Sequence, residues 1–160
     1  MQDIVKIEFK VLDEKCTIPS QGTAFSGGWD VTCTEIVQTN KSQAICKLGF
    51  AVAIPDGYKL TLVPRSSITK TSWVMQNSPG LIDSDYRGEC QMRFRAIPTG
   101  IEPNPDNDYP SLCYDDFPFK VGDCIGQVYL EEVIPIIFQQ VDELSKTVRG
   151  EGGFGSTTKS

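Results

Sequence analysis

The sequence contains no histidine among its 160 residues. A catalytic site of the Ser-His-Asp or Cys-His type is therefore excluded, because both use an imidazole as the base. Any general base must instead be a carboxylate, an amine, a phenol or a thiolate. A structural zinc site is also disfavoured, since the six cysteines include no C-x-x-C pair and no imidazole is present to complete a ligand set.

Long apolar runs are also missing. None approaches the length of a membrane span, and the charged N-terminal segment MQDIVKIEFKVLDEK lacks the apolar stretch of a signal peptide. We therefore expect an intracellular, cytoplasmic protein with reduced thiols. Cys46, Cys90 and Cys124 lie among apolar residues and are predicted to fill the core. The formal net charge of −6 disfavours a stable nucleic-acid or membrane partner, because both partners are anionic.

What is present indicates one all-β domain. The 14 glycines and 10 prolines suit a turn-rich β architecture better than a helical bundle. Alternation of apolar and polar residues with a period of two predicts strands at residues 48–54, 58–63, 89–97 and 125–133. The expected helical content is at most one short helix, at residues 66–75.

Two segments lack this alternation. Residues 99–118 are rich in proline and acidic side chains, and we predict a long surface loop there, inserted in the β domain. Residues 149–160 are rich in Gly, Ser and Thr and cannot build a core. We therefore divide the chain into a β domain, residues 1–148, and a flexible C-terminal arm, residues 149–160.

Five short segments carry residues suited to an anionic substrate. Residues 24–30 contain two glycines, which allow a tight turn before Asp30. Residues 63–67 contain an Arg followed by two Ser hydroxyl groups. Residues 77–89 place carboxylates, a Tyr and an Arg on a Gly-bounded hairpin, where a carboxylate can take a proton from water. Residues 121–128 open an apolar strand, and the glycines of residues 149–157 let backbone approach a phosphate closely. Each segment alone is equally typical of an ordinary turn, helix cap, hairpin tip or disordered tail.

Taken together and in this order, the five segments closely resemble the five motifs of the trimeric dUTPase family, from about Ala24 to Thr157. The third and fifth, G-L-I-D-S-D-Y-R-G-E and R-G-E-G-G-F-G-S-T, are the most specific. The resemblance implies a jelly-roll β-barrel and a homotrimer with sites at subunit interfaces. It also implies Mg²⁺-dependent hydrolysis of dUTP to dUMP and pyrophosphate, which limits uracil incorporation into DNA and supplies dUMP for dTMP synthesis.

The resemblance also implies a role for individual residues. Asp83 would activate the water that attacks the α-phosphorus, and Asp30 would hold Mg²⁺ through a water. Tyr86 would lie under the deoxyribose and exclude a ribose 2′-hydroxyl. The arm would close over the active site. The other substrate contacts are assigned to Arg65, Ser66, Ser67 and Gln127 at the phosphates, to Asn77, Gly80 and Ile82 at the uracil edge, to Arg149, Gly155, Ser156 and Thr157 in the closing arm, and to Phe154, stacked on uracil.

The sequence departs from the family pattern at three positions. Ser67 replaces a Gly, Gly126 replaces an Ala, and Cys124 replaces an Arg, which removes a cation and a five-donor fork. Two alternatives stay open. Arg65-Ser66-Ser67 matches the R-S-S motif of the dCTP deaminases, which share the fold, so deamination or a bifunctional enzyme is one. The other is a dUTP-sensing regulatory protein, with residues 99–118 as the surface for an unidentified protein partner.

Overall fold

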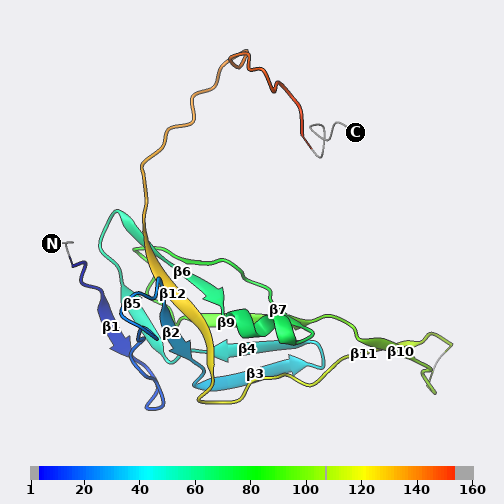
Figure 1. Cartoon of the computed structure of the whole chain (residues 1–160). Helices are drawn as coiled ribbons and strands as arrows, with labels where there is room; N and C mark the ends of the chain where they lie inside the picture. The colour runs from blue at the N-terminus through cyan, green and yellow to red at the C-terminus, as the bar shows by residue number, and fades with distance from the viewer. Residues whose placement is uncertain (1–3, 107, 154–160) are drawn as a thin grey trace.

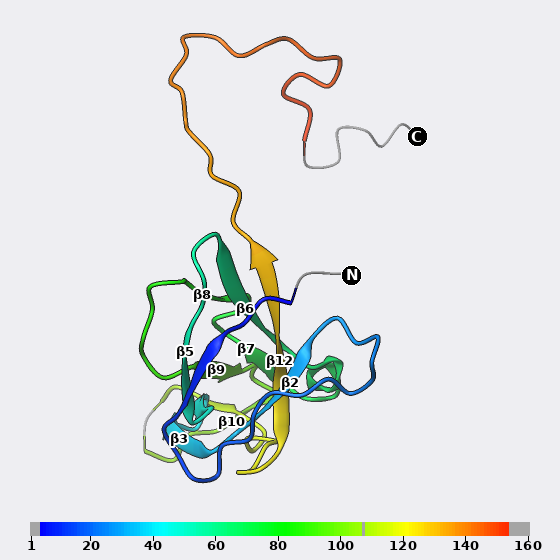
Figure 2. The same cartoon turned by 90° about the vertical axis from the view of Figure 1, so that its left-hand side faces the viewer.

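The computed structural model describes residues 4–106 and 108–153 and confirms an all-β, antiparallel architecture. Two four-stranded sheets face each other, and two shorter strand pairs complete the structure (Figures 1 and 2). The strands are β1 (Glu8–Val11), β2 (Trp29–Thr32), β3 (Glu35–Asn40), β4 (Gln43–Lys47), β5 (Phe50–Ala53), β6 (Tyr58–Pro64), β7 (Trp73–Met75), β8 (Gly80–Ile82), β9 (Gln91–Ala96), β10 (Gly100–Glu102), β11 (Ser111–Cys113) and β12 (Cys124–Glu132), with the 3₁₀-helix η1 (Ser66–Lys70) between β6 and β7.

The order of the strands places the motif segments in one framework. One sheet runs β2-β12-β6-β8 and the other β3-β4-β9-β7, while β1 pairs with β5. β12 is hydrogen-bonded on both sides, to β2 and to β6. The segment of residues 121–128 is therefore held between the first two motif segments, and β8 forms the free edge of that sheet.

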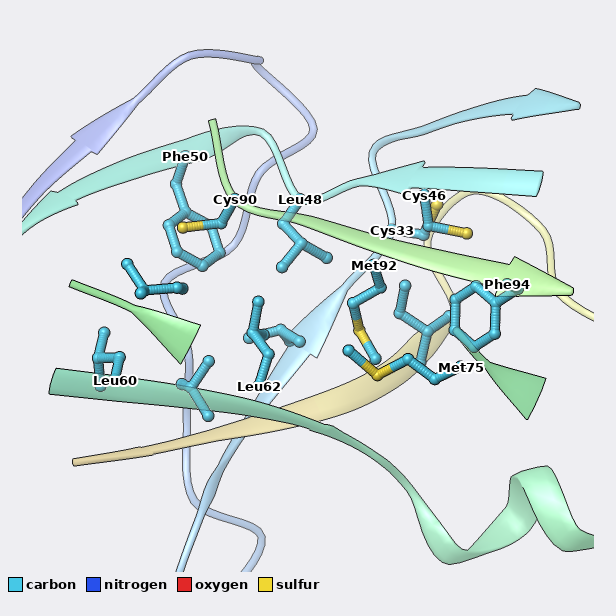
Figure 3. Close-up of a cluster of buried hydrophobic side chains, with 14 of the residues drawn as sticks. Cys33, Cys46, Leu48, Phe50, Leu60, Leu62, Met75, Cys90, Met92 and Phe94 are labelled. Atoms are coloured by element: carbon cyan, nitrogen blue, oxygen red, sulfur yellow. The ribbon is translucent and has the colours of Figure 1, made fainter. Parts of the chain in front are cut away.

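The core lies between the two sheets. Buried side chains from both sheets point toward one another, including Leu62, Met92 and Phe94 (Figure 3). β9 shows the predicted alternation: its apolar side chains are buried, while Arg93 and Arg95 are exposed. Burial of such apolar area contributes roughly 25 cal/mol per Å², which makes this interface the main stabilising element of the fold.

The prediction of a helix over residues 66–75 is wrong in its second half. Only Ser66–Lys70 is helical, and no side chain caps this helix. The chain then forms β7, where Trp73 and Met75 are buried and Val74 is exposed. Pairing of β7 with β9 and burial of alternate side chains override the weak helical preference of this stretch.

The prediction of an unstructured loop at residues 99–118 is incomplete. β10 and β11 pair to form a hairpin that projects from the body (Figure 1). Its base is fixed: Trp73 Nε1 donates to the carbonyls of Asp115 and Asp116 at 3.1 Å, and Ser72 Oγ donates to the Asp115 carboxylate at 2.7 Å. The ring of Phe117 also packs edge-on against Trp73, with 4.9 Å between ring centroids. The hairpin therefore has a rigid root.

After β12 the chain leaves the body. Residues 133–153 run outward without regular secondary structure, and the figures agree on this path (Figures 1 and 2). Several of their apolar side chains are exposed, and they are Val133, Ile134, Ile136, Ile137, Phe138, Val141, Leu144 and Val148. Within the described part of the chain, no helix is long and apolar enough to span a membrane.

Candidate active site

The first and fourth motif segments meet across neighbouring strands. Asp30 on β2 and Gln127 on β12 are register partners, although 97 residues separate them. Gln127 Nε2 donates to Asp30 Oδ1 at 2.8 Å, and the carboxylate is half-buried. Gly28 must be small here, because a Cβ would lie 3.3 Å from the Gln127 Cβ. The amide of Gln127 therefore fixes one oxygen of the Asp30 carboxylate.

Cys124 belongs to this cluster rather than to the core. The prediction that it fills the core is wrong, because its side chain is only half-buried, whereas Cys46 and Cys90 are buried. It lies beside Asp30 and Arg65: burial and the Asp30 charge raise the pKa of the thiol, and the Arg65 guanidinium opposes that rise. The thiol is therefore neutral. The cation that the family motif carries at this position is replaced by a neutral group between Asp30 and Arg65.

The structure explains the glycine at position 126. A Cβ there would lie 2.5 Å from both Cε and Sδ of Met92 and 2.8 Å from the Val63 carbonyl oxygen. Met92 is fully buried, and the oxygen of Val63 belongs to the backbone, so neither group can move away at low energetic cost. The Met92 side chain thus occupies the space that a methyl group at position 126 would need.

We expect Gly126→Ala to destabilise the fold by about 1–3 kcal/mol, the usual cost of overpacking a core. The measurement is the melting temperature. Gly27→Ala is the matched control, because a Cβ at Gly27 meets nothing within 4 Å. Equal melting temperatures for the two variants would contradict this account of the packing.

A cavity of about 180 Å³ lies between the free edge strand β8 and strand β9. Asn77 organises its wall: Asn77 Oδ1 accepts from the Arg93 backbone N–H at 2.9 Å, and Nδ2 donates to the Gln91 carbonyl at 3.3 Å. Gly80 is closely packed, since a Cβ would lie 3.2 Å from the Asn77 carbonyl. The residues that line the cavity are Leu62, Asn77, Gly80, Leu81, Ile82, Tyr86, Glu89, Cys90, Gln91 and Arg93.

The hairpin after β8 presents the predicted base beside this cavity. Asp83 follows Ile82 directly and is exposed. Its carbonyl accepts the Tyr86 N–H at 3.1 Å, which closes the turn. The Tyr86 ring folds over Gly88, where a Cβ would lie 2.3 Å from the phenol oxygen, and the hydroxyl donates to the Glu89 carbonyl at 3.3 Å. The turn therefore fixes the Tyr86 ring and the backbone at Asp83, while the Asp83 side chain is exposed.

The structure gathers some predicted residues and not others. Asn77, Gly80, Ile82 and Tyr86 line one cavity, and Asp83 directly follows Ile82 in the chain. Gln127 bonds Asp30, Cys124 lies beside both Asp30 and Arg65, and Ser66 and Ser67 are exposed at η1. Arg149 lies on the outgoing C-terminal segment, where its Nε donates to the Gly152 carbonyl at 2.8 Å. The predicted contacts Phe154, Gly155, Ser156 and Thr157 lie outside the described residues.

Four cavity residues lie outside the five motif segments, and two of them, Gln91 and Arg93, are polar. Both are on β9, just beyond the third motif segment. The signal was present in the sequence, because the alternation of β9 turns Gln91, Arg93 and Arg95 away from the core. Only the position of β8 beside β9 shows which of these three border a cavity.

An exposed carboxylate near a cavity of about 180 Å³, and polar and charged groups gathered at Asp30, Gln127 and Arg65, are the kinds of group that a nucleotide-processing enzyme uses. Comparison with known proteins narrows this class. The family model described as dUTPase matches residues 14–97. A deoxyuridine 5′-triphosphate nucleotidohydrolase from Zymomonas mobilis is 38% identical over 157 residues, covering 96% of this chain and 97% of the relative. The chain belongs to the dUTPase family.

Solved structures agree with this assignment. The dUTPase of Staphylococcus bacteriophage 80alpha, solved with dUPNHPP, aligns with a TM-score of 0.75 and 25% identity over 96% of this chain and 99% of its own. A variant dUTPase from phage phi11 of S. aureus, described with a structural Mg(II) ion, aligns with a TM-score of 0.66 and 24% identity. That alignment covers 86% of this chain and 97% of the phage chain, and it supports the fold.

Proposed function

We propose that this member of the dUTPase family hydrolyses dUTP to dUMP and pyrophosphate, with Asp83 as the general base. The observation that carries the proposal is the position of Asp83: it is exposed at the start of a fixed turn that borders a cavity large enough for a pyrimidine. Tyr86, in the same turn, lines this cavity, and its role in the proposal is to pack against the sugar. A ribose 2′-hydroxyl would then meet the phenol ring, which selects deoxyribose.

The chemistry needs no covalent intermediate. Asp83 takes one proton from a water molecule, and the water oxygen forms a bond to the α-phosphorus while the bond to the bridging α,β-oxygen breaks. The electron pair of that bond leaves with pyrophosphate. Arg65 and Gln127 bind phosphate oxygens, and Ser66 and Ser67 donate to them. Phosphoryl transfer of this kind is catalysed mainly by positioning and electrostatics.

We propose Mg²⁺ as the cofactor, held largely by the substrate. Among residues 4–106 and 108–153 no group of three or more Cys, Asp or Glu side chains could hold a metal alone. Asp30 fits a water-mediated role, because its half-buried carboxylate is oriented by the hydrogen bond from Gln127. Mg²⁺ commonly keeps several waters and binds one or two carboxylates together with substrate phosphates. When bound, it would neutralise phosphate charge on the leaving pyrophosphate.

We propose that the enzyme is a homotrimer. The outgoing segment after β12 exposes apolar side chains that include Ile136, Ile137 and Phe138. The body carries an apolar cavity of about 640 Å³, lined in part by Phe9, Phe50 and Val52. Exposed apolar area of this kind gains stability when a second copy covers it. A C-terminal arm, residues 149–160, would then reach a neighbour's site.

Substrate selection tests the proposed function. We expect the wild-type enzyme with Mg²⁺ to release pyrophosphate from dUTP much faster than from dCTP, dTTP or UTP. Pyrophosphate and ammonia are measured in parallel for each nucleotide. Turnover of UTP comparable to that of dUTP would contradict the role of Tyr86, and ammonia release from dCTP would identify a deaminase.

The β10–β11 hairpin is proposed as the site of a second, partner-binding role, because it is exposed, acidic and rooted rigidly on Trp73. Such a role adds to catalysis and does not replace it, since the Asp83 turn is intact. We also propose a reducing, cytoplasmic setting, because all six cysteines are free thiols.

A further inference from the structure

We propose that Arg93 is a specificity-determining residue that favours uracil over cytosine. The proposal rests on the proposed function, in which the cavity between β8 and β9 receives the base. Arg93 lies on β9, its side chain is exposed, and it lines that cavity together with Gln91 and Asn77. No motif of the family includes it.

Among the residues that the structure describes, Arg93 is the only cation that lines the cavity. The other ionisable groups there are Tyr86, Glu89 and Cys90. Burial raises the pKa of the Cys90 thiol to about 12, so this group is neutral. The Glu89 carboxylate is turned to the Gly49 N–H, from which its Oε1 accepts a hydrogen bond at 3.2 Å. Among the described residues, Arg93 makes no ion pair that would neutralise its guanidinium.

Asn77 cannot distinguish the two bases by itself. Its Oδ1 and Nδ2 already bind the backbone of Arg93 and Gln91. Its contribution is to accept the backbone N–H of Arg93 at 2.9 Å (N to Oδ1), and this bond fixes the position of the Arg93 backbone.

A guanidinium that faces C4 of the base distinguishes uracil from cytosine, because it has five donors and no acceptor. Uracil presents a carbonyl oxygen at C4, where cytosine presents an amino group that can only donate. Placed opposite C4, the Arg93 guanidinium pairs with the carbonyl oxygen of uracil and opposes the amino group of cytosine, because two sets of donors would face each other there. A site built around such a donor rejects the wrong base more strongly than a purely apolar pocket does.

The test compares Arg93→Gln with Arg95→Gln. Arg95 is the matched control, because it lies two residues on along β9 and is exposed in the same way, but does not line the cavity. The dissociation constants of dUMP and dCMP are measured by calorimetry, together with kcat/KM for dUTP and dCTP. Binding of the monophosphates needs no catalytic step, so failure of this proposal is distinguishable from failure of the proposed hydrolysis.

We expect Arg93→Gln to lower the preference for dUMP over dCMP by about tenfold, the usual weight of one well-placed base contact. The loss should appear mainly in KM for dUTP. Arg93→Lys should keep most of the preference, and Arg95→Gln all of it. A preference unchanged by Arg93→Gln, or reduced equally by Arg95→Gln, overturns the proposal.

Discussion

Asp83→Asn should lower kcat for dUTP by about 10²–10⁴-fold, the usual loss when a general base is removed. An amide keeps the shape of the carboxylate but cannot accept the proton of the attacking water. The side chain of Asp83 is exposed, and the turn is closed by its backbone carbonyl, which accepts the Tyr86 N–H. The fold and the cavity should therefore survive the substitution.

Two measurements separate lost chemistry from lost structure. The Asp83→Asn variant should bind dUPNHPP with nearly normal affinity and melt at nearly the wild-type temperature. Asp85→Asn, an exposed carboxylate in the same turn, serves as the matched control and should lose much less activity. Turnover close to normal in Asp83→Asn would show that another group deprotonates the water.

Ending the chain at Val148 should reduce kcat/KM for dUTP by at least about 100-fold, while assembly and melting temperature change little. The truncation removes Arg149 together with the glycine-rich backbone donors, which act mainly on the charged transition state. In the structure, Arg149 and Gly152 contact each other through hydrogen bonds of 2.8 and 3.0 Å. These hydrogen bonds join the two residues to each other and not to the β-sheets, so removing them should not weaken the sheets.

A chain ending at Thr157 is the control, because it keeps the whole fifth motif segment. Phe154→Ala should be milder than the truncation, losing about 1–3 kcal/mol if the ring stacks on the base as aromatic side chains do in single-strand binders. Steady-state turnover and light scattering are measured for all three. Full activity in the chain that ends at Val148 would mean that the arm takes no part in catalysis.

The alternation of apolar residues made β9 predictable, because one face of that strand meets the core and the other meets solvent. β7 was missed, since three residues are too few for a period to emerge and its pairing with β9 decides its conformation. β10 and β11 have no fully buried side chain, so no alternation of buried and exposed residues predicts these strands from the sequence. Within the described part of the chain they pair only with each other, and the fixed root at Trp73 holds the base of the hairpin.

For the candidate site, the motifs identified the chemical groups but did not show which residues contact one another in the fold. The contact between Asp30 and Gln127 depends on the register of β2 against β12, across a bulge between Cys124 and Gly126. The same register brings Cys124 out of the core and beside Arg65. The reason for Gly126 likewise depends on Met92, which belongs to the opposite sheet. Long-range register of this kind cannot be obtained from local composition.

The root of the β10–β11 hairpin also bears on how this protein can change over time. The chain enters and leaves the hairpin at adjacent points, because the Thr99 N–H binds the Cys113 carbonyl at 2.9 Å. Everything beyond that closed stem can lengthen, shorten or be exchanged without altering the spacing of the strands on either side. The tip of the hairpin is therefore a suitable insertion site for a peptide tag or a small domain. Related sequences can also vary there while the nucleotide site stays constant.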